Sequence, residues 1–483
     1  MRRKLLLSFF LLLPLSVAWA GEQPFGSLVH LTISRQLPDI IRPWKWLPSG
    51  DVVGQGLALD GNTVLTVAHL LDGATRIELR FASAPLPVEL EVVYLDRDRD
   101  LALLRGSLPE ELKPLDMGNE VGALLPSDKV SYGWVDKEGR LKEGSAEVGE
   151  YVVSRQRESF QSQLWIQLVK ANAQIPEGTP FFRSGSLVGL AAMNAGGRTW
   201  IIPREVLESA LDFSRAQARG ASAMQGFAVE DCTMTALRER LAIAGEKGGC
   251  FVSKVFGQGA GSESLLSGDV ILRVGGHPVD AWQHYIRPGL GRLNFMHLVS
   301  DCLLSGRLPV EIVREGESKT FDLDLSLIDE GRWLIPRYRG GQPSDYLIRG
   351  GIVFQPLSLP YLRAWGDGWK MKAPVDLVAI LEEHLYEVKS ESLHEIIVLS
   401  QLLAHPRNRG LQGIYGKVVR SADGKPLSGL SALKAAFDGA QRELLLELEP
   451  GGEPLLLDAA ALRAADGEIA KRYGVPSLER ITL

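Results

Sequence analysis

Residues 54–69 predict two short antiparallel strands that end in a histidine. Two apolar runs, residues 57–59 and 63–67, flank Asp60-Gly61-Asn62, which is typical of a tight hairpin turn. His69 directly follows the second run. Asp100 stands 31 residues further along, at the start of the apolar run 101–104. Both residues therefore stand at the ends of predicted apolar strands.

A histidine and an aspartate at strand ends can supply two parts of a catalytic triad. In a serine peptidase the histidine is the general base, and the buried carboxylate fixes its tautomer. His69 and Asp100 are the candidates for these two roles. The nucleophile must then lie further along the chain.

At these residues the chain resembles the HtrA/Deg family of serine proteases. That family carries Thr-x-x-His, then Asp-Leu/Ile-Ala, then Gly-Asn-Ser-Gly-Gly-Pro at the nucleophile. Thr66, His69 and the run 100–102 fit the first two motifs. Residues 174–182 are Gln-Ile-Pro-Glu-Gly-Thr-Pro-Phe-Phe, and the flanking segments 185–190 and 200–203 fix the register. The resemblance therefore puts Glu177 in the position of the serine.

Three departures from the family motif favour an inactive site. Glu177 has no hydroxyl proton for His69 to remove, and its carboxylate should pair with the imidazole. Pro176 brings no backbone donor, and Ile175 replaces a glycine whose conformation a β-branched residue adopts only with strain. Loss of one oxyanion donor alone costs about 10²–10³ in rate.

A shifted nucleophile is the alternative. Ser184 and Ser186 are close to the motif, but the sequence Ser-Gly-Ser-Leu-Val-Gly is typical of a hairpin turn. Neither serine is followed by Gly-Gly-Pro or Gly-Pro. We therefore interpret His69, Asp100 and Glu177 as the remnant of a triad.

The N-terminal residues predict export. Arg2, Arg3 and Lys4 precede the apolar run 5–17, and residues 18–20 are Ala-Trp-Ala, a small-x-small cleavage site. We expect residues 1–20 to be a signal peptide and the mature protein to be periplasmic. No later segment approaches the roughly 20 apolar residues of a membrane span.

Length and composition predict several domains and exclude some partners. A chain of 483 residues with 45% hydrophobic residues is long enough for about three domains. Removal of Arg2, Arg3 and Lys4 changes the net charge from −6 to −9, which gives no electrostatic case for nucleic acid. No His/Cys cluster has metal-ligand spacing, so we expect neither a metal nor a cofactor.

The cysteine count leaves two alternatives open. Cys232, Cys250 and Cys302 are the only cysteines. An odd number in an exported protein permits at most one intramolecular disulfide. Cys232 and Cys250 are the nearest pair in sequence, whereas three buried free thiols are the other interpretation.

After a helix predicted over residues 204–219 and a small-residue linker at 216–223, the chain resembles a PDZ domain at residues 222–327. Residues 266–271 are Leu-Ser-Gly-Asp-Val-Ile, a specific PDZ signature. The resemblance implies that the backbone amides of Gly226, Phe227, Ala228 and Val229 hold a peptide carboxylate. The alternative is a groove that is filled from within or used only for assembly.

The last third, residues 328–483, resembles the divergent second PDZ-like domain of plant-type Deg proteases. The resemblance rests on residues 334–336, 346–354 and 359–362. In addition, residues 422–427 repeat the turn of residues 275–279, and each turn precedes an apolar stretch that predicts a helix.

Together these features predict a mainly β chain. The resemblance implies a chymotrypsin-like double β-barrel at residues 21–215 followed by two PDZ-like α+β domains. We expect a pseudoprotease that binds or holds polypeptides or regulates a partner protease, with unfolded chains or protein C-termini as partners and no nucleic acid. Trimers are common in the family. The competing functions are an active serine endopeptidase for misfolded envelope proteins and a non-catalytic scaffold or adaptor.

Overall fold

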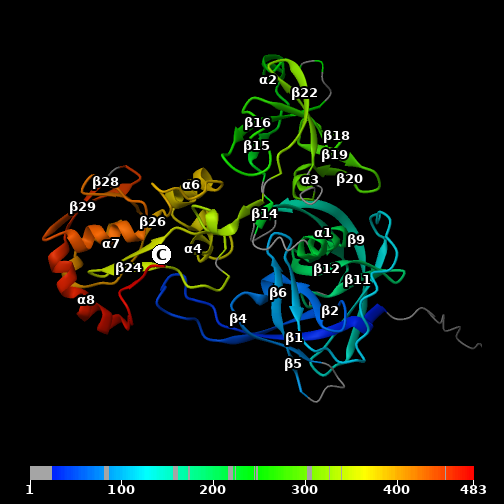
Figure 1. The fold of residues 1–483 in the computed structure, drawn as a ribbon, viewed down its shortest axis with the longest axis horizontal. Helices are drawn as coiled ribbons and strands as arrows, with labels where there is room; N and C mark the ends of the chain where they lie inside the picture. Colours follow the sequence, from blue (N-terminus) through cyan, green and yellow to red (C-terminus); the bar gives the residue numbers. More distant parts are fainter. Residues whose placement is uncertain are drawn as a thin grey trace, which may run out of the picture.

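The computed structural model describes residues 24–482, except for residues 81–85, 156–160, 172–174, 216–220, 224, 244, 246–247, 302–306, 326, 339 and 452. Strands dominate the described part, and successive sheets follow one another along the chain (Figure 1). The predicted signal peptide and Cys302 lie outside the described residues. Within the described ranges, no helix is long and apolar enough to cross a bilayer.

The first sheet has seven antiparallel strands in the order β5-β4-β1-β2-β3-β7-β6. Its β2–β3 hairpin closes over the predicted turn, with Leu57 opposite Leu65 and Ala58 opposite Val64. The sheet buries one apolar face against a core that includes part of the following barrel. The strands are β1 (Leu28–Arg35), β2 (Gly50–Ala58), β3 (Thr63–Val67), β4 (Ala74–Arg80), β5 (Val88–Glu89), β6 (Glu91–Asp96) and β7 (Leu101–Arg105), with the 3-10 helices η1 (Pro24–Ser27) and η2 (Ala68–Leu71).

The second sheet is a closed six-stranded barrel in the order β10-β13-β12-β11-β8-β9. Helix α1 (Arg204–Arg215) follows it and buries Val206, Leu207 and Ala210 in the core shared with the first sheet. The two sheets and α1 form the mainly β, trypsin-like part of the chain. The barrel strands are β8 (Lys129–Val135), β9 (Leu141–Arg155), β10 (Ser162–Val169), β11 (Pro180–Arg183), β12 (Ser186–Ala195) and β13 (Arg198–Pro203).

The third sheet belongs to an α+β unit, which we call the middle unit. Its strand order is β15-β16-β17-β21-β22, with β18 on β17 and a separate β19–β20 hairpin. The elements are β15 (Phe227–Glu230), α2 (Thr235–Arg240), β16 (Cys250–Val255), β17 (Val270–Val274), β18 (His277–Pro278), β19 (His284–Arg287), β20 (Gly291–Asn294), α3 (Met296–Asp301), β21 (Pro309–Arg314) and β22 (Glu317–Asp322).

The linker predicted at residues 216–223 is wrong in its last part. Strand β14 (Ala221–Ala223) pairs with β23 (Leu327–Asp329), and Ser222 lies opposite Ile328. Small residues had indicated a loop, but this backbone is hydrogen-bonded to the far end of the middle unit. Residues 216–220 lie outside the described ranges, so the helix predicted over residues 204–219 is described as α1 only as far as Arg215.

The fourth sheet belongs to the C-terminal unit and has the order β30-β29-β27-β26-β25-β24-β31, with β28 on β27. Its elements are η4 (Glu330–Arg332), β24 (Tyr346–Arg349), β25 (Ile352–Pro356), α4 (Leu359–Arg363), α5 (Trp369–Lys372), α6 (Val375–His384), β26 (Ile397–Leu402), η5 (Pro406–Asn408), η6 (Gln412–Ile414), β27 (Val418–Ala422), β28 (Lys425–Pro426), α7 (Leu430–Gly439), β29 (Glu443–Glu449), β30 (Glu453–Asp458), α8 (Ala459–Tyr473) and β31 (Glu479–Arg480).

The middle and C-terminal units share one strand order. The sheet order β15-β16-β17-β21-β22 of the middle unit corresponds to β25-β26-β27-β29-β30 of the C-terminal unit. In each unit a short strand, β18 or β28, pairs with the third of these strands, and a helix, α3 or α7, precedes the last two. The repeated turns pair alike, since Val274 lies opposite His277 and Ala422 opposite Lys425. The internal repeat predicted from residues 275–279 and 422–427 therefore has a structural counterpart.

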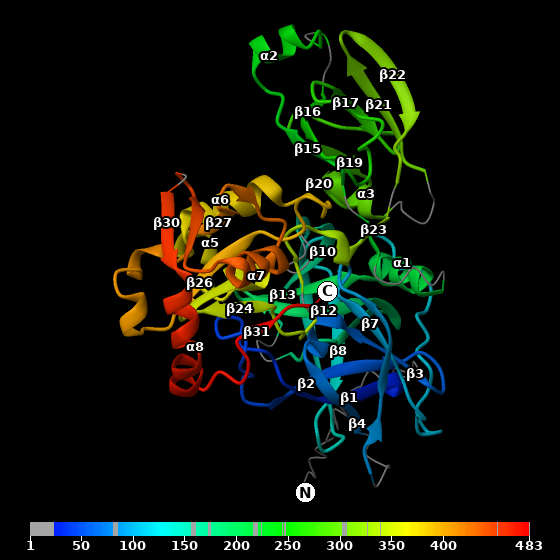
Figure 2. The same ribbon diagram turned by 60° about the vertical axis from the view of Figure 1, so that its left-hand side comes forward.

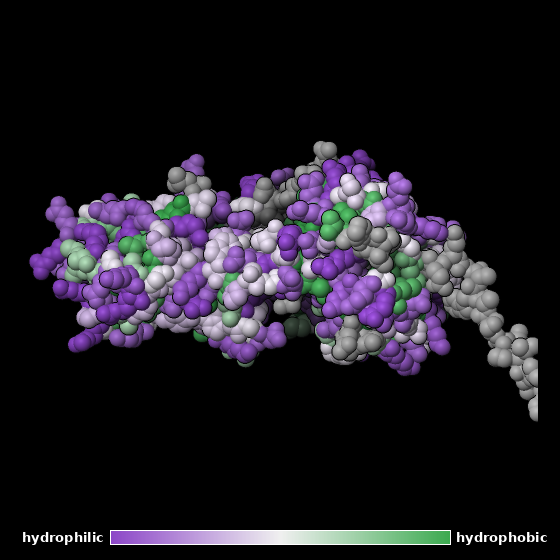
Figure 3. Space-filling model, turned by 90° about the horizontal axis from the view of Figure 1, so that it is seen from below, coloured by the Kyte–Doolittle hydropathy of each residue, from purple (hydrophilic) through white to green (hydrophobic). Residues whose placement is uncertain are grey.

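The two α+β units stand on different sides of the trypsin-like part (Figures 1 and 2). The middle unit, drawn in green, lies beyond β9 and α1, and the C-terminal unit, drawn in yellow to red, lies beside the first strands. Seen from below, the surface is mixed, with hydrophobic residues in small separate groups (Figure 3).

The cysteine pair that was nearest in sequence is not bonded. Cys232 and Cys250 are both free and buried. Cys250 packs in the apolar cluster of Ile271, whereas Cys232 packs in a second cluster with Val270. Adjacent residues of one strand point to opposite faces of a sheet, so the two thiols meet different faces. Burial raises the pKa of both thiols.

Candidate functional site

The imidazole of His69 is held at the end of the β2–β3 hairpin. The short helix η2 begins directly after β3, and the N–H of Ala68 donates to the carbonyl of Asp100 at 3.1 Å. Inside the hairpin, the hydroxyl of Thr66 donates to the carbonyl of Gln55 at 2.8 Å. These bonds tie two residues just before His69 to β2 and to Asp100, which directly precedes β7.

Asp100 fixes the orientation of the His69 ring. Its backbone has φ +59°, and its side chain is buried beside β7. One carboxylate oxygen accepts from the His69 N–H at 2.9 Å, and the other lies 2.8 Å from Nδ1. With Nδ1 engaged in this way, Nε2 faces the loop before β11.

Glu177 occupies the space in front of Nε2. Its Oε2 lies 2.8 Å from Nε2 of His69, and its carbonyl accepts from the N–H of Gln55 at 2.8 Å. Gly178 makes this approach possible, because it has φ +82° and a Cβ there would lie 2.1 Å from the carbonyl oxygen of Gln55. The side chains of His69 and Glu177 are 27% and 37% exposed, so the pair faces a partly open surface.

The residues before Glu177 do not carry the backbone strain expected of them. Ile175, which is one of the described residues, does not have a positive φ. Its side chain is buried in the core of the six-stranded barrel, and its carbonyl accepts from Asn194 Nδ2 at 2.9 Å. The prediction of strain at Ile175 is therefore wrong, because the loop follows a path that a β-branched residue can adopt.

The electrostatics favour a protonated imidazole. Burial by itself lowers the pKa of His69, but the negative charges of Asp100 and Glu177, with their hydrogen bonds, raise it to about 10. At neutral pH the ring is thus an imidazolium between two carboxylates. Since such a ring has no free nitrogen lone pair, it cannot accept a proton from a nucleophile.

The alternative serines lie away from this cluster. Ser184 is in the exposed turn between β11 and β12, at the opposite end of β11 from Glu177. A strand of this length spans roughly 13 Å. Ser186 begins β12 and packs against the chain at Gly118. Both positions agree with the predicted hairpin turn.

The residues predicted to hold a peptide carboxylate begin an edge strand. Phe227 is paired with Val255 in β15 and β16, and its side chain is buried in the core of the middle unit. The Gly226 N–H donates to the carbonyl of Ala260 at 2.7 Å, so this amide is already bonded. The described structure thus has no free amide at Gly226, in contrast to the expected loop.

Ala228 and Val229 line a pocket of about 270 Å³ beside this edge strand. Met296 of α3 forms another wall, as helices of this kind do in a strand-addition groove. Two further walls come from outside the middle unit. They are Val153, Ser154, Arg155 and Ser162 from β9 and β10, and Glu382, Leu385 and Tyr386 at the end of α6.

In the C-terminal unit the corresponding edge is covered by the chain itself. Strand β25 corresponds to β15, and β24 pairs with it antiparallel, with Leu347 opposite Phe354. Helix α7 packs over these strands, with the ring of Phe437 5.6 Å from that of Phe354. β31 then pairs with β24. The edge of β25 is therefore not open to a ligand strand.

The structure brings His69, Asp100 and Glu177 together and puts Ala228 and Val229 at a separate groove. Within the part of the chain that it describes, no group of three or more His, Cys, Asp or Glu side chains could hold a metal ion. The contribution of α6 to the groove could not be predicted from the sequence, because no local pattern links residues 382–386 to β15.

Comparisons with known proteins agree with this architecture. A PDZ domain model matches residues 335–479. The chain is 22% identical over 475 residues to the putative protease Do-like 3, mitochondrial, of Arabidopsis thaliana, covering 95% of this chain and 80% of the relative. It is 25% identical over 475 residues to the chloroplastic protease Do-like 2 of the same plant, covering 94% and 74%.

Among solved structures, an HtrA-type protease AlgW with decapeptide superposes with a TM-score of 0.47 and 17% identity, covering 63% of this chain and 96% of that one. The sequence relatives span nearly all of the chain. With the PDZ match, they bear out the resemblance carried by the residues around His69 and Asp100. The chain is therefore similar to Do-like proteases over nearly its whole length, which supports the HtrA/Deg resemblance, and a PDZ domain model matches its C-terminal part.

Proposed function

We propose that this protein is a pseudoprotease that binds polypeptides without cleaving them. The observation that carries the proposal is the double pairing of His69, whose two ring nitrogens both lie 2.8 Å from a carboxylate oxygen. Peptide hydrolysis by a triad needs a hydroxyl nucleophile and a free base. In this site Glu177 supplies no hydroxyl, and the imidazolium is no base.

The second part of the proposal concerns binding. The edge of β15 and the pocket at Ala228, Val229 and Met296 support capture of an extended peptide as an added strand. Main-chain hydrogen bonds supply affinity in this mode, and side-chain pockets supply choice. Unfolded polypeptides or protein C-termini are the partners that such an edge accepts.

We further propose that the protein acts outside the cytoplasm, in the periplasm, in envelope protein quality control. The support is the signal-peptide pattern of residues 1–20. The two plant relatives are named mitochondrial and chloroplastic, so their names also place them outside the cytosol. A trimer is the assembly that the family resemblance suggests.

A paired assay of cleavage and binding tests the proposal. Purified mature protein should leave unfolded casein intact over hours while retaining it in a pull-down or a calorimetric titration. Cleavage that His69→Ala abolishes would establish the competing endopeptidase. If the protein neither cleaves nor binds casein, the scaffold or adaptor function is favoured.

A further inference from the structure

The turn that presents Asp100 to His69 has few anchors of its own. It connects β6 with β7 in residues 97–100, and Asp100 adopts φ +59° at its end. Asp96 supports the turn locally, since its carboxylate accepts from the Arg99 N–H at 2.9 Å and from the Arg99 guanidinium at 3.0 Å. The remaining contacts reach residues far away in the sequence.

Helix α3 of the middle unit supplies distant contacts to Asp98 and Arg99, whereas the Arg97 guanidinium lies over the ring of Tyr338 and 4.0 Å from Asp72. The guanidinium of Arg99 donates to the carbonyl of Ser300 at 3.1 Å. The Ser300 hydroxyl donates to Gln161 at 3.0 Å, and the Gln161 amide donates to Asp98 at 3.3 Å. Two separate hydrogen-bonded routes thus join one residue of α3 to the two residues that precede Asp100.

Arg99 is buried at this junction rather than solvated. Its guanidinium carbon lies 4.1 Å from the ring centroid of Phe213 in α1, and its side chain is 10% exposed. A hydrogen bond from a buried, charged donor is worth more than an exposed one and is costly to lose. The contact with α3 is therefore a firm one.

Helix α3 is itself fixed within the middle unit. His297 is fully buried, with Nε2 2.8 Å from the Tyr285 hydroxyl and Nδ1 2.9 Å from Asp301. Met296, one residue earlier, lines the groove beside β15. One short helix thus touches both the groove and the turn at Asp100.

We propose that α3 positions Asp100 against His69, and that Arg99 and Gln161 are the positioning residues that transmit this constraint. The middle unit is then a structural part of the His69 cluster and not a separate appendage. The proposal concerns the geometry of the cluster and does not depend on whether the groove binds a peptide.

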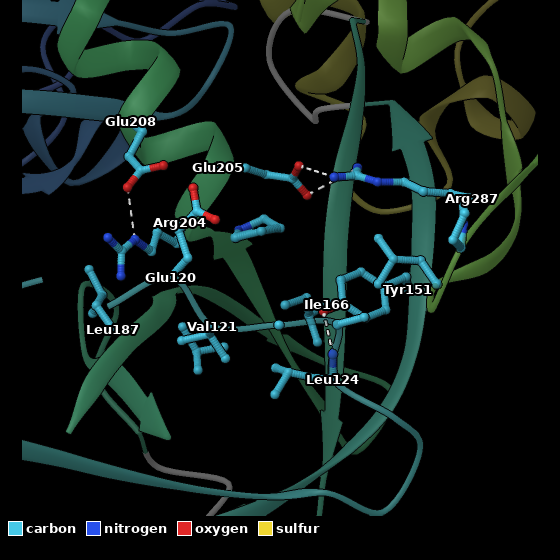
Figure 4. Close-up of a pocket in the computed structure, with 16 residues that line it drawn as sticks. Glu120, Val121, Leu124, Tyr151, Ile166, Leu187, Arg204, Glu205, Glu208 and Arg287 are labelled. Carbon is cyan, nitrogen blue, oxygen red and sulfur yellow. Dashed lines mark hydrogen bonds and ion pairs between the residues drawn. The ribbon is translucent and has the colours of Figure 1, made fainter. Parts of the chain in front are cut away.

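A second contact between the middle unit and the barrel serves as the control. Across a pocket of about 320 Å³, Arg287 forms an ion pair with Glu205 at 2.6 Å, near Tyr151 (Figure 4). This pair joins the β19–β20 hairpin to α1 and does not involve residues 96–100. Arg287→Gln should weaken the same interface without releasing the turn.

The test is an NMR titration of the His69 imidazole in the full-length mature protein, assigned with His69→Gln. Gln161→Leu and Arg99→Met should each lower the pKa of His69 by roughly half a unit or more, because Asp100 is less firmly held against Nδ1. Arg287→Gln should leave it unchanged. Far-UV circular dichroism shows that each variant is folded.

Each outcome has a definite meaning. An unchanged His69 titration in a folded Gln161→Leu variant and a folded Arg99→Met variant would overturn the proposal. An equal shift of the His69 pKa in Arg287→Gln would also overturn the proposal, because any loosening of the interface would then be enough to lower this pKa. If Arg99→Met does not fold, the comparison of Gln161→Leu with Arg287→Gln decides alone.

Discussion

Oε2 of Glu177 lies 2.8 Å from Nε2 of His69, at the nitrogen that a triad histidine directs toward its serine. Asp100 holds the opposite nitrogen at the same distance. The cluster therefore keeps the orientation of a catalytic histidine while replacing the proton donor by a second anion. His69 is thus paired with a carboxylate at each ring nitrogen.

Because of its ion pairs, His69 contributes less to the free energy of unfolding as the pH becomes alkaline. The pKa of His69 rises from 6.5 in the unfolded chain to about 10 in the folded protein, so its stabilising contribution is fully present below pH 6.5 and is lost as the pH rises to 10. Urea unfolding at pH 6, 8 and 10 should show the free-energy advantage of the native protein over His69→Gln shrinking across this range. A constant difference would contradict the pairing.

Replacing the acid alone should not restore proteolysis. In Glu177→Ser, Ile175 remains anchored in the barrel core and Pro176 still lacks an N–H. Loss of oxyanion donors costs about 10²–10³ in rate. Casein cleavage should stay undetectable in this variant, whereas exchange of residues 175–179 for Gly-Asn-Ser-Gly-Gly allows the loop to direct the N–H groups of residues 175 and 177 at an oxyanion. Robust cleavage by the single variant would show an intact oxyanion hole.

Gly178 should be intolerant of any side chain. Gly178→Ala should lower the free energy of unfolding by about 3 kcal/mol, because it adds backbone strain at φ +82° and a clash with the carbonyl of Gln55. Gly185→Ala is the matched control, with φ +84° and nothing within 4 Å of its added Cβ. It should cost about 1 kcal/mol. Equal losses in denaturant titrations would mean that the clash is relieved.

Peptide capture should depend on the wall of the groove at Ala228. Ala228→Phe fills the pocket beside β15 and should weaken the binding of an unfolded peptide at least roughly tenfold in calorimetry, from an affinity near the micromolar level. Leu456→Phe, at a position 62% exposed on β30, should have no effect.

Amidation of the peptide tests the carboxylate mechanism separately. The Gly226 N–H is already bonded to Ala260, so strand pairing carries the binding and amidated peptides should bind within about threefold of free ones. A loss on amidation as large as that of Ala228→Phe would show instead that a chain terminus is captured by the remaining amides.

The site could be predicted from the sequence because its signals are local. The turn at residues 60–62 and the apolar strands place His69 and Asp100 at strand ends, and the motif flanks fix Glu177. The path of the loop could not be predicted. The side chain of Ile175 is buried in the core of the six-stranded barrel, a tertiary contact that no short pattern encodes.

The middle unit shows the same division between local and distant signals. The strand that contains Phe227 can be predicted from its own residues. The hydrogen bond from the Gly226 N–H to the Ala260 carbonyl cannot, because it joins two segments that are distant in sequence. The contact of Arg99 with Ser300 spans 201 residues, and nothing near either residue indicates the other. Cys232 and Cys250 were the nearest pair in sequence but are not bonded, and the two buried thiols belong to different apolar clusters.

The strands added to β25 also protect the chain from its neighbours. An uncovered sheet edge presents unpaired N–H and C=O groups that can recruit a strand from another molecule and start aggregation. β24 covers this edge, and the sheet then ends in β31, which is only Glu479 and Arg480. A short, charged last strand is a poor template for further addition, so this end of the sheet is shielded against pairing with another molecule.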